Sequence, residues 1–254
     1  MIKIYTAVVN RPDFIDLQKK CFDKFLKNKY QFIVIDDSIE RKVTKEIEIV
    51  CENNNITYIK TPDNLDHTNP MIACWAVLQW TYDNFIKNTN DKVIFLDSDM
   101  FLFDYFDAEK YINSCDLSGV PQAREYIWYL WNGLLFFNMQ NIKDKEISFA
   151  PGLVRNIPTD VGGHTYEYML KNPEINIRNI IHTSHINQKR KNTNIIPLKV
   201  RDVYRDYYNF EILMSKFLHY GSSTNWKQNW RSTNDPTKEK TQYLKYFLNK
   251  MIEE

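Results

Sequence analysis

Alternating strands and helices in the first hundred residues constrain the fold most. Residues 2–9, 31–35 and 56–59 are short β-rich apolar runs, and residues 14–26 and 40–51 between them repeat apolar side chains at helical spacing. Such a series predicts right-handed βαβ units and a largely parallel sheet flanked by helices. The fold class expected is therefore α/β.

One more helix and one more strand complete this half. Asn69 followed by Pro70 is a typical helix start, with Asn as the cap, and predicts a helix to about Lys87. The four apolar residues before Asp97 show no alternation, which predicts a central strand buried on both faces.

The second half is less regular. Strands are expected at residues 133–138, 194–200 and 217–219, and helices at residues 165–170 and 242–252. No repeat, low-complexity tract or linker divides the chain, so we expect one domain over residues 1–254.

Glycine content and charge exclude or disfavour several classes of function. The six glycines cannot form the GxGxxG fingerprint of dinucleotide-binding folds or the GxxxxGK phosphate loop. A formal net charge of +1 gives no global field that would attract nucleic acid or an anionic membrane, although a local basic patch is left open. No nucleic-acid partner is expected.

Polar residues follow three of the predicted strands: Asn10-Arg11, Asp36-Asp37 and Asp97-Ser98-Asp99. Because ligands bind beyond the carboxyl ends of parallel strands, these clusters are expected to converge on one edge. Asp97 and Asp99, two apart, are expected to point to the same side of the pleat and to suit Mg²⁺ or Mn²⁺. A strand end can also use such an aspartate only to cap a turn.

The surrounding segment, VIFLDSDMFLFD, resembles the DxD element of GT-A glycosyltransferases. Two further segments follow in the order found in those enzymes. The run from Trp131 to Asn138 resembles their asparagine–glycine–hydrophobic–asparagine strand, and the run from Phe217 to Lys227 resembles their late metal–histidine loop.

That loop departs from the pattern of the glycogenin-like and bacterial galactosyltransferase branch, which is His-x-x-Gly-x-x-Lys-Pro-Trp. Here Gly221 comes one residue early, and Lys227 follows Trp226 instead of preceding it. His219 keeps its place in the pattern, whereas a diphosphate-binding role does not carry over to Lys227.

The resemblance implies a GT-A fold with a Rossmann-like, mainly parallel sheet. About residues 1–100 would bind the nucleotide and end in the DxD element, residues 101–230 would hold the acceptor and the metal histidine, and residues 231–254 would form a C-terminal helix. The implied reaction moves a sugar from a nucleotide-diphosphate sugar, UDP- or GDP-linked, to a hydroxyl of a glycan-type acceptor. The implied metal, Mn²⁺ or Mg²⁺, would be held by Asp97, Asp99 and His219.

Donor-binding residues are expected on both sides of this metal. Asp36 or Asp37 would accept a hydrogen bond from the base, with one of the two only capping a turn. The full expected set is Thr6, Val8, Asn10, Arg11, Asp36, Asp37, Asp97, Ser98, Gly221, Ser222 and Asn225.

An inverting enzyme also needs a base for the acceptor hydroxyl, and Asp160 is the candidate. Gly162 and Gly163 would let the backbone approach a ligand, with His164 as a second acceptor-site residue and Glu167 as the fallback base. Alternatively, Asp160 is a helix N-cap, or the enzyme is retaining and needs no such base.

The expected cell compartment is inferred from features that the sequence lacks. The four cysteines form no CxxC pair and indicate free thiols in a reducing compartment. Without a signal-like start or an apolar run near the roughly 20 residues of a membrane helix, a cytoplasmic enzyme of a bacterium or virus is expected. The apolar stripe over residues 242–252 packs on the domain or on a second copy.

Three other functions fit parts of the pattern. A nucleotidyltransferase shares the acidic metal site but usually has a Gly-rich basic loop after the first strand, where this chain has Val9-Asn10-Arg11-Pro12. A haloacid-dehalogenase-type phosphatase carries its Asp-x-Asp at the first strand, not in mid-chain. A sugar-nucleotide or glycan-binding module that has lost catalysis is the non-enzyme alternative.

Overall fold

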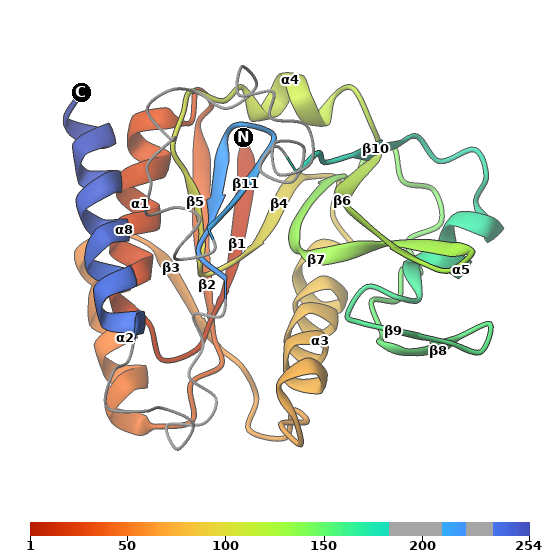
Figure 1. The fold of residues 1–254 in the computed structure, drawn as a ribbon, viewed down its shortest axis with the longest axis horizontal. Helices are drawn as coiled ribbons and strands as arrows, with labels where there is room; N and C mark the ends of the chain where they lie inside the picture. The colour runs from red at the N-terminus through yellow and green to blue at the C-terminus, as the bar shows by residue number, and fades with distance from the viewer. Residues whose placement is uncertain (183–209, 222–235) are drawn as a thin grey trace.

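The computed structural model describes residues 1–182, 210–221 and 236–254. Its centre is a seven-stranded sheet of order β10-β6-β7-β4-β1-β2-β3 (Figure 1). Strands β1 (Ile2–Val8), β2 (Tyr30–Asp36), β3 (Thr57–Lys60) and β4 (Lys92–Asp97) run parallel. The expected α/β class with a mainly parallel central sheet is confirmed.

The second half of the chain extends the same sheet. Strand β7 (Ile127–Asn138) is antiparallel to both β4 and β6 (Leu117–Arg124), and β10 (Ile177–Asn179) is parallel to β6. Residues on both sides of the DxD segment therefore share one sheet.

Helices cover both faces of the sheet (Figure 1). Helices α1 (Pro12–Phe25), α2 (Arg41–Asn53) and α8 (Pro236–Glu253) lie on one side, and α3 (Pro70–Thr81) lies on the other. Two apolar clusters, one on each side, form the core. The α8 stripe packs into the first of them, so this chain covers it.

The start of α3 follows the sequence expectation. The Asn69 side chain accepts the backbone N–H of Ile72 at 3.0 Å, which satisfies one of the free donors of the first turn. The helix continues into a π-helical turn, Tyr82–Ile86, and so ends one residue short of the expected Lys87.

A three-stranded sheet lies beside the central one: β11 (Glu211–Leu213), β12 (Phe217–His219) and β5 (Met100–Leu102). A hairpin of β8 (Gly152–Val154) and β9 (Ile157–Thr159) precedes α5 (Thr165–Lys171), and α4 (Ala108–Ile112) connects β5 to β6. Of these, the sequence predicted only β12 and α5.

Strand β7 begins earlier than predicted. The expected strand over residues 133–138 is the second half of β7, and the aromatic segment before it is the first half. In that half Ile127 and Tyr129 are buried while Trp128 is partly exposed, so the aromatic residues alternate between core and surface.

Three further sequence features can be compared with the fold. The strand expected over residues 194–200 lies outside the described residues. All four cysteines are free thiols. Within the described ranges, no helix is long and apolar enough to span a membrane.

Candidate active site

The ends of three parallel strands meet, as the sequence predicted. Strand β1 lies between β2 and β4, with Val8 opposite Asp36 and Ala7 opposite Asp97. The acidic ends of β2 and β4 therefore lie on one edge of the sheet, on either side of the end of β1.

Asp97 and Asp99 come together through a turn and not through the pleat. Asp97 is the last residue of β4, and the chain turns at Ser98 and Asp99 before it enters β5. The pleat argument for these two side chains was therefore wrong. Burial and the negative charge of Asp99 raise the pKa of Asp97 to about 7, so the two carboxylates still interact strongly.

Strand register brings His219 to this turn. Strand β12 pairs with β5 so that His219 lies opposite Met100, and the N–H of Tyr220 donates to the carbonyl of Asp99 at 2.9 Å. As a result, Nε2 of His219 lies 3.5 Å from Oδ1 of Asp99.

Glu211 orients the imidazole from the other side. Strand β11 places it directly across from His219, and its Oε2 lies 2.7 Å from Nδ1. Burial alone would lower the pKa of His219, but Asp99 and Glu211 raise it to about 10. The ring of Trp131 lies against the imidazole at a centroid distance of 5.1 Å.

This donor set was tested against a divalent cation. The described residues contain no group of three or more His, Cys, Asp or Glu side chains already spaced as a metal site. Two donors, the Asp99 carboxylate and the Nε2 of His219, do face each other, and Glu211 holds Nδ1 as outer-shell carboxylates do for metal-bound histidines. The residues therefore fit a cation that replaces the proton between Asp99 and His219.

Asp160 borders a cavity. It lines a space of about 680 Å³ with Met71, Arg124, Glu125, Ile157, Pro158 and Thr159. Its Oδ1 accepts the N–H of Val161 at 2.8 Å. The helix that follows is capped by His164 without a side-chain bond, so Asp160 is not its N-cap.

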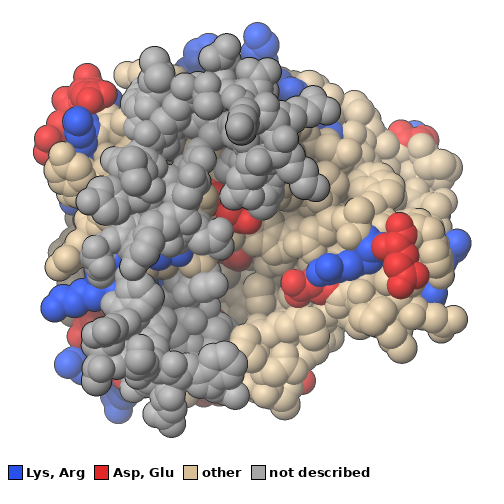
Figure 2. All heavy atoms as spheres, in the orientation of Figure 1, with Lys and Arg blue, Asp and Glu red and all other residues tan. Residues whose placement is uncertain are grey.

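Cys74 lies near Asp160 and near the two carboxylates of the Asp97–Asp99 turn. Burial raises the pKa of this thiol, and the charges of Asp97, Asp160 and Asp99 raise it further, while the Nδ2 of Asn132 donates to Sγ at 3.0 Å. One thiol therefore lies within electrostatic reach of all three carboxylates. Figure 2 shows acidic atoms beside a hollow near the centre of this face.

The glycines after Asp160 pack against protein, contrary to the expected approach to a ligand. Gly162 has a φ of +95°, and a Cβ there would lie 1.9 Å from the carbonyl oxygen of Leu130. A Cβ on Gly163 would lie 1.9 Å from Oγ1 of Thr159. His164 does not line the cavity, and Glu167 lies exposed on α5.

Of the residues in and after β1 that were predicted to bind the donor, fewer are exposed than expected. Thr6 and Val8 have no exposed surface, so their side chains do not line an open site. Asn10 is exposed, with a φ of 56°, and its N–H donates to Oγ of Ser38. Arg11 pairs with Asp13 and stacks its guanidinium 3.3 Å above the ring of Phe14.

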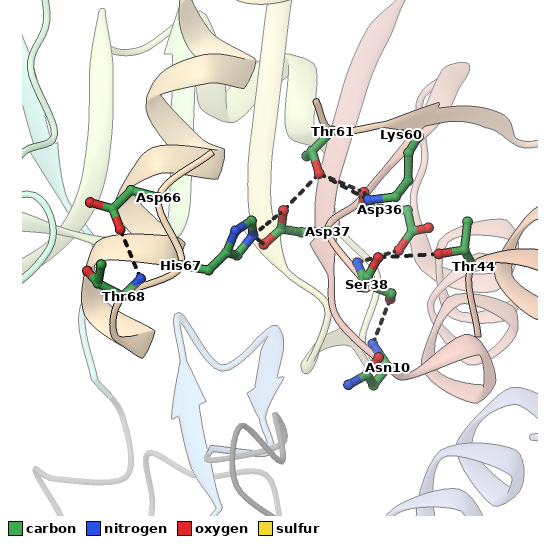
Figure 3. A network of polar contacts seen from close by, with 10 residues as sticks. All are labelled: Asn10, Asp36, Asp37, Ser38, Thr44, Lys60, Thr61, Asp66, His67 and Thr68. Carbon is green, nitrogen blue, oxygen red and sulfur yellow. Dashed lines mark hydrogen bonds and ion pairs between the residues drawn. The ribbon is translucent and has the colours of Figure 1, made fainter. Parts of the chain in front are cut away.

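Both carboxylates after β2 already have protein partners (Figure 3). Oδ1 of Asp36 accepts the N–H of Ser38, and its Oδ2 accepts the hydroxyl of Tyr58, both at 2.9 Å. Asp36 therefore caps the turn after β2, the role that was expected for one of Asp36 and Asp37.

Asp37 is held by two other side chains in the same network (Figure 3). Its Oδ1 accepts the hydroxyl of Thr61 at 2.8 Å, and Nε2 of His67 lies 3.0 Å from each carboxylate oxygen. A donor base would have to displace one of these partners to reach Asp37. No sequence pattern indicated His67, because the loop that carries it has no periodicity.

The loop after His219 is described only at its start. Gly221 has a φ of 69°, and its carbonyl accepts Nζ of Lys240 at 3.1 Å. Lys240 comes from α8 and was not singled out in the sequence. Ser222 and Asn225 lie outside the described residues.

Comparisons with known proteins give matches only among solved structures. No family model and no curated protein matches the sequence. The chain is similar to an active-site mutant of LgtC, with 14% identity over 96% of this chain and 95% of that one, and a TM-score of 0.49. It is also similar to the glycosyltransferase GlyE of Streptococcus pneumoniae TIGR4, with 14% identity over 98% of this chain and 63% of that one, and a TM-score of 0.47.

A galactosyltransferase LgtC complex with donor and acceptor sugar analogues matches with 18% identity over 54% of this chain, and a TM-score of 0.39. The alignment spans 58% of that LgtC chain, less than two thirds of its length. The three solved structures compared above are thus all glycosyltransferases.

Proposed function

We propose that the protein transfers a sugar from a nucleotide-diphosphate sugar to a hydroxyl of a glycan-type acceptor, in a metal-dependent reaction. The observation that supports the proposal is the contact of His219 with Asp99, in the turn that follows Asp97. Asp160 lies within electrostatic reach of the same thiol, Cys74, as these two carboxylates, and it lines a cavity.

Asp97, Asp99 and His219 would hold Mn²⁺ or Mg²⁺. When bound, the cation supplies Lewis-acid stabilisation of the charge that develops on the leaving diphosphate. Glu211 keeps the imidazole oriented so that Nε2 faces Asp99. Asn10, which is exposed at the end of β1, would border the nucleoside.

The cavity beside Asp160 would hold the acceptor. At about 680 Å³ it falls within the range of small-molecule sites, and its lining joins apolar Met71 and Ile157 to charged Arg124 and Glu125. That mixture suits a sugar, which has apolar ring faces and hydroxyl edges. In an inverting reaction, the Asp160 carboxylate would take the proton of the acceptor hydroxyl.

Thermal unfolding with a panel of UDP-, GDP-, dTDP- and CMP-sugars, with and without Mn²⁺, tests the donor and the metal together. A ligand at about 100 times its Kd stabilises the native state by roughly 2.7 kcal/mol. We expect a Mn²⁺-dependent shift with one nucleotide, UDP or GDP. If no sugar nucleotide shifts the midpoint at millimolar concentration, the proposal is wrong.

A nucleotidyltransferase and a binding module that has lost catalysis are the competing functions. The first would release pyrophosphate from a nucleoside triphosphate. The second would bind the donor with Mn²⁺ yet never hydrolyse or transfer its sugar. Measuring the released nucleotide by chromatography separates both from a glycosyltransferase, which releases the nucleoside diphosphate.

Glu211→Gln tests the role of the outer carboxylate. The amide keeps the shape but removes the charge that holds Nδ1, and loss of such a partner weakens metal affinity about 10- to 100-fold. We expect this loss in a Mn²⁺ titration followed by electron paramagnetic resonance. Lys216→Met, in the same β-hairpin and paired with the distant Asp104, is the control, and an equal loss in both variants would contradict the assignment.

A further inference from the structure

Gln18 is a polar side chain placed where the sequence predicts only core. It lies in the middle of α1, among residues that pack into the apolar cluster on that side of the sheet, and none of its surface is exposed. A buried amide in a helix face otherwise made of Phe, Ile, Leu and Cys requires a reason, because a polar group costs free energy to bury unless it is hydrogen-bonded.

Both donor hydrogens of Gln18 go to the DxD turn. Its Nε2 donates to the carbonyl of Asp97 at 3.0 Å and to the carbonyl of Met100 at 2.9 Å. The two acceptors are the residues on either side of Ser98 and Asp99, so one side chain holds both ends of the turn.

The acceptor half of the amide is left unpaired. Oε1 of Gln18 is buried and has no partner among the described residues. The reverse amide orientation would point Oε1 at two carbonyl oxygens and gain no hydrogen bond, so this orientation is the favourable one. At this position, two hydrogen bonds from Nε2 to the turn offset the free-energy cost of one unpaired buried oxygen.

Two further backbone contacts hold the same turn. Ser98 donates its N–H to the carbonyl of Ala7 in β1, and Tyr220 donates its N–H to the carbonyl of Asp99. The turn is thus held by β1 on one side, by the strand that carries His219 on another, and by Gln18 of α1 on the third.

We infer that Gln18 is a positioning residue, which holds the Asp97–Met100 turn so that the mutually repelling carboxylates of Asp97 and Asp99 stay where His219 meets them. It touches neither metal nor substrate. The metal-binding role of the turn rests on the proposed function. The hydrogen bonds by which Gln18 holds the turn do not depend on it.

Gln18→Met tests the hold directly. Methionine has a similar length, fills the same apolar space and lacks both donors. By amide hydrogen exchange in the metal-free protein, we expect the Ser98 and Tyr220 amides to exchange at least about tenfold faster, as for the loss of one or two hydrogen bonds, and to be accelerated more than the Val34 amide in β2. Equal exchange at Ser98 and Tyr220 in wild type and variant would overturn the inference.

Leu17→Ala is the matched control, because Leu17 is the neighbouring buried residue of α1 and its aliphatic side chain cannot donate a hydrogen bond to the two carbonyls. It should speed exchange broadly, with Ser98 and Tyr220 no more affected than Val34. If Leu17→Ala reproduces the selective pattern of Gln18→Met, helix packing and not the Gln18 amide holds the turn, and the inference fails.

The affinity of the whole protein for Mn²⁺ is the second measurement. Gln18→Met should weaken Mn²⁺ affinity at least about tenfold, as the loss of an outer-shell partner does, and saturating Mn²⁺ should restore most of kcat. Faster exchange with unchanged Mn²⁺ affinity would overturn the positioning role. If wild type itself binds no Mn²⁺ with any sugar nucleotide, the proposed function fails, while hydrogen exchange still decides whether Gln18 holds the turn.

Discussion

Asp99→Asn is expected to lower metal-dependent turnover by about 10³-fold or more, since a metal contributes several kcal/mol of charge stabilisation and about 1.4 kcal/mol is a factor of ten. The amide keeps the shape of the turn but removes the charge that faces Nε2 of His219 at 3.5 Å. It also removes the repulsion that raises the pKa of Asp97. The fold should survive, because the backbone contacts of the turn do not involve this carboxylate.

The measurement is release of nucleoside diphosphate over a range of Mn²⁺ concentrations, with circular dichroism to verify the fold. Asp104→Asn is the matched control: it neutralises another aspartate just beyond β5, one that pairs with Lys216 at 2.9 Å. Asp104→Asn should retain wild-type turnover. Full activity of Asp99→Asn would remove this carboxylate from the metal site.

Asp160→Asn carries the second largest expected effect, a loss of roughly 10²- to 10⁴-fold in transfer if Asp160 is the general base. Asparagine can still accept the N–H of Val161 through its carbonyl oxygen, so the local backbone should be kept. Donor binding should not change, because Asp160 lines the cavity assigned to the acceptor. The loss should therefore fall on kcat, with the Kd of the donor unaltered.

Glu167→Gln is the control for this variant, because Glu167 is the other carboxylate considered for the base and lies exposed on α5. Transfer is followed with an acceptor found active in the wild type, and the anomeric configuration of the product is read by NMR. Unchanged transfer in Asp160→Asn, together with retained configuration, would show a retaining enzyme and remove Asp160 as base.

The general geometry of parallel sheets explains why the grouping of these strand ends at one edge was predictable. The strands that end near Asn10, Asp36 and Asp97 are local features, set by apolar runs and turn residues. Once they are parallel neighbours, their carboxyl ends must meet at one edge. The placing of Asp36 and Asp97 at one edge of the sheet followed from that rule, and the strand order put β1 between them.

Where a site depended on side-chain partners, the sequence was less informative. It indicated one of Asp36 and Asp37 as an acceptor for a base and the other as a turn cap, yet the structure pairs both with Tyr58, Thr61 and His67. Buried carboxylates find hydrogen-bond partners within the protein, and those partners came from a neighbouring strand and from a loop without periodicity.

The sequence by itself determined the α/β class and the parallel half of the sheet, and its resemblance to GT-A glycosyltransferases joined Asp97, Asp99 and His219 as one set of candidates. Periodicity and short motifs are local, so they can be read along the chain. Only the tertiary structure decided that Glu211 stands across from His219, and that Gln18 holds a turn 79 and 82 residues away in sequence. Strand register and helix docking set those contacts, because they depend on how distant segments pack and leave no spacing in the chain.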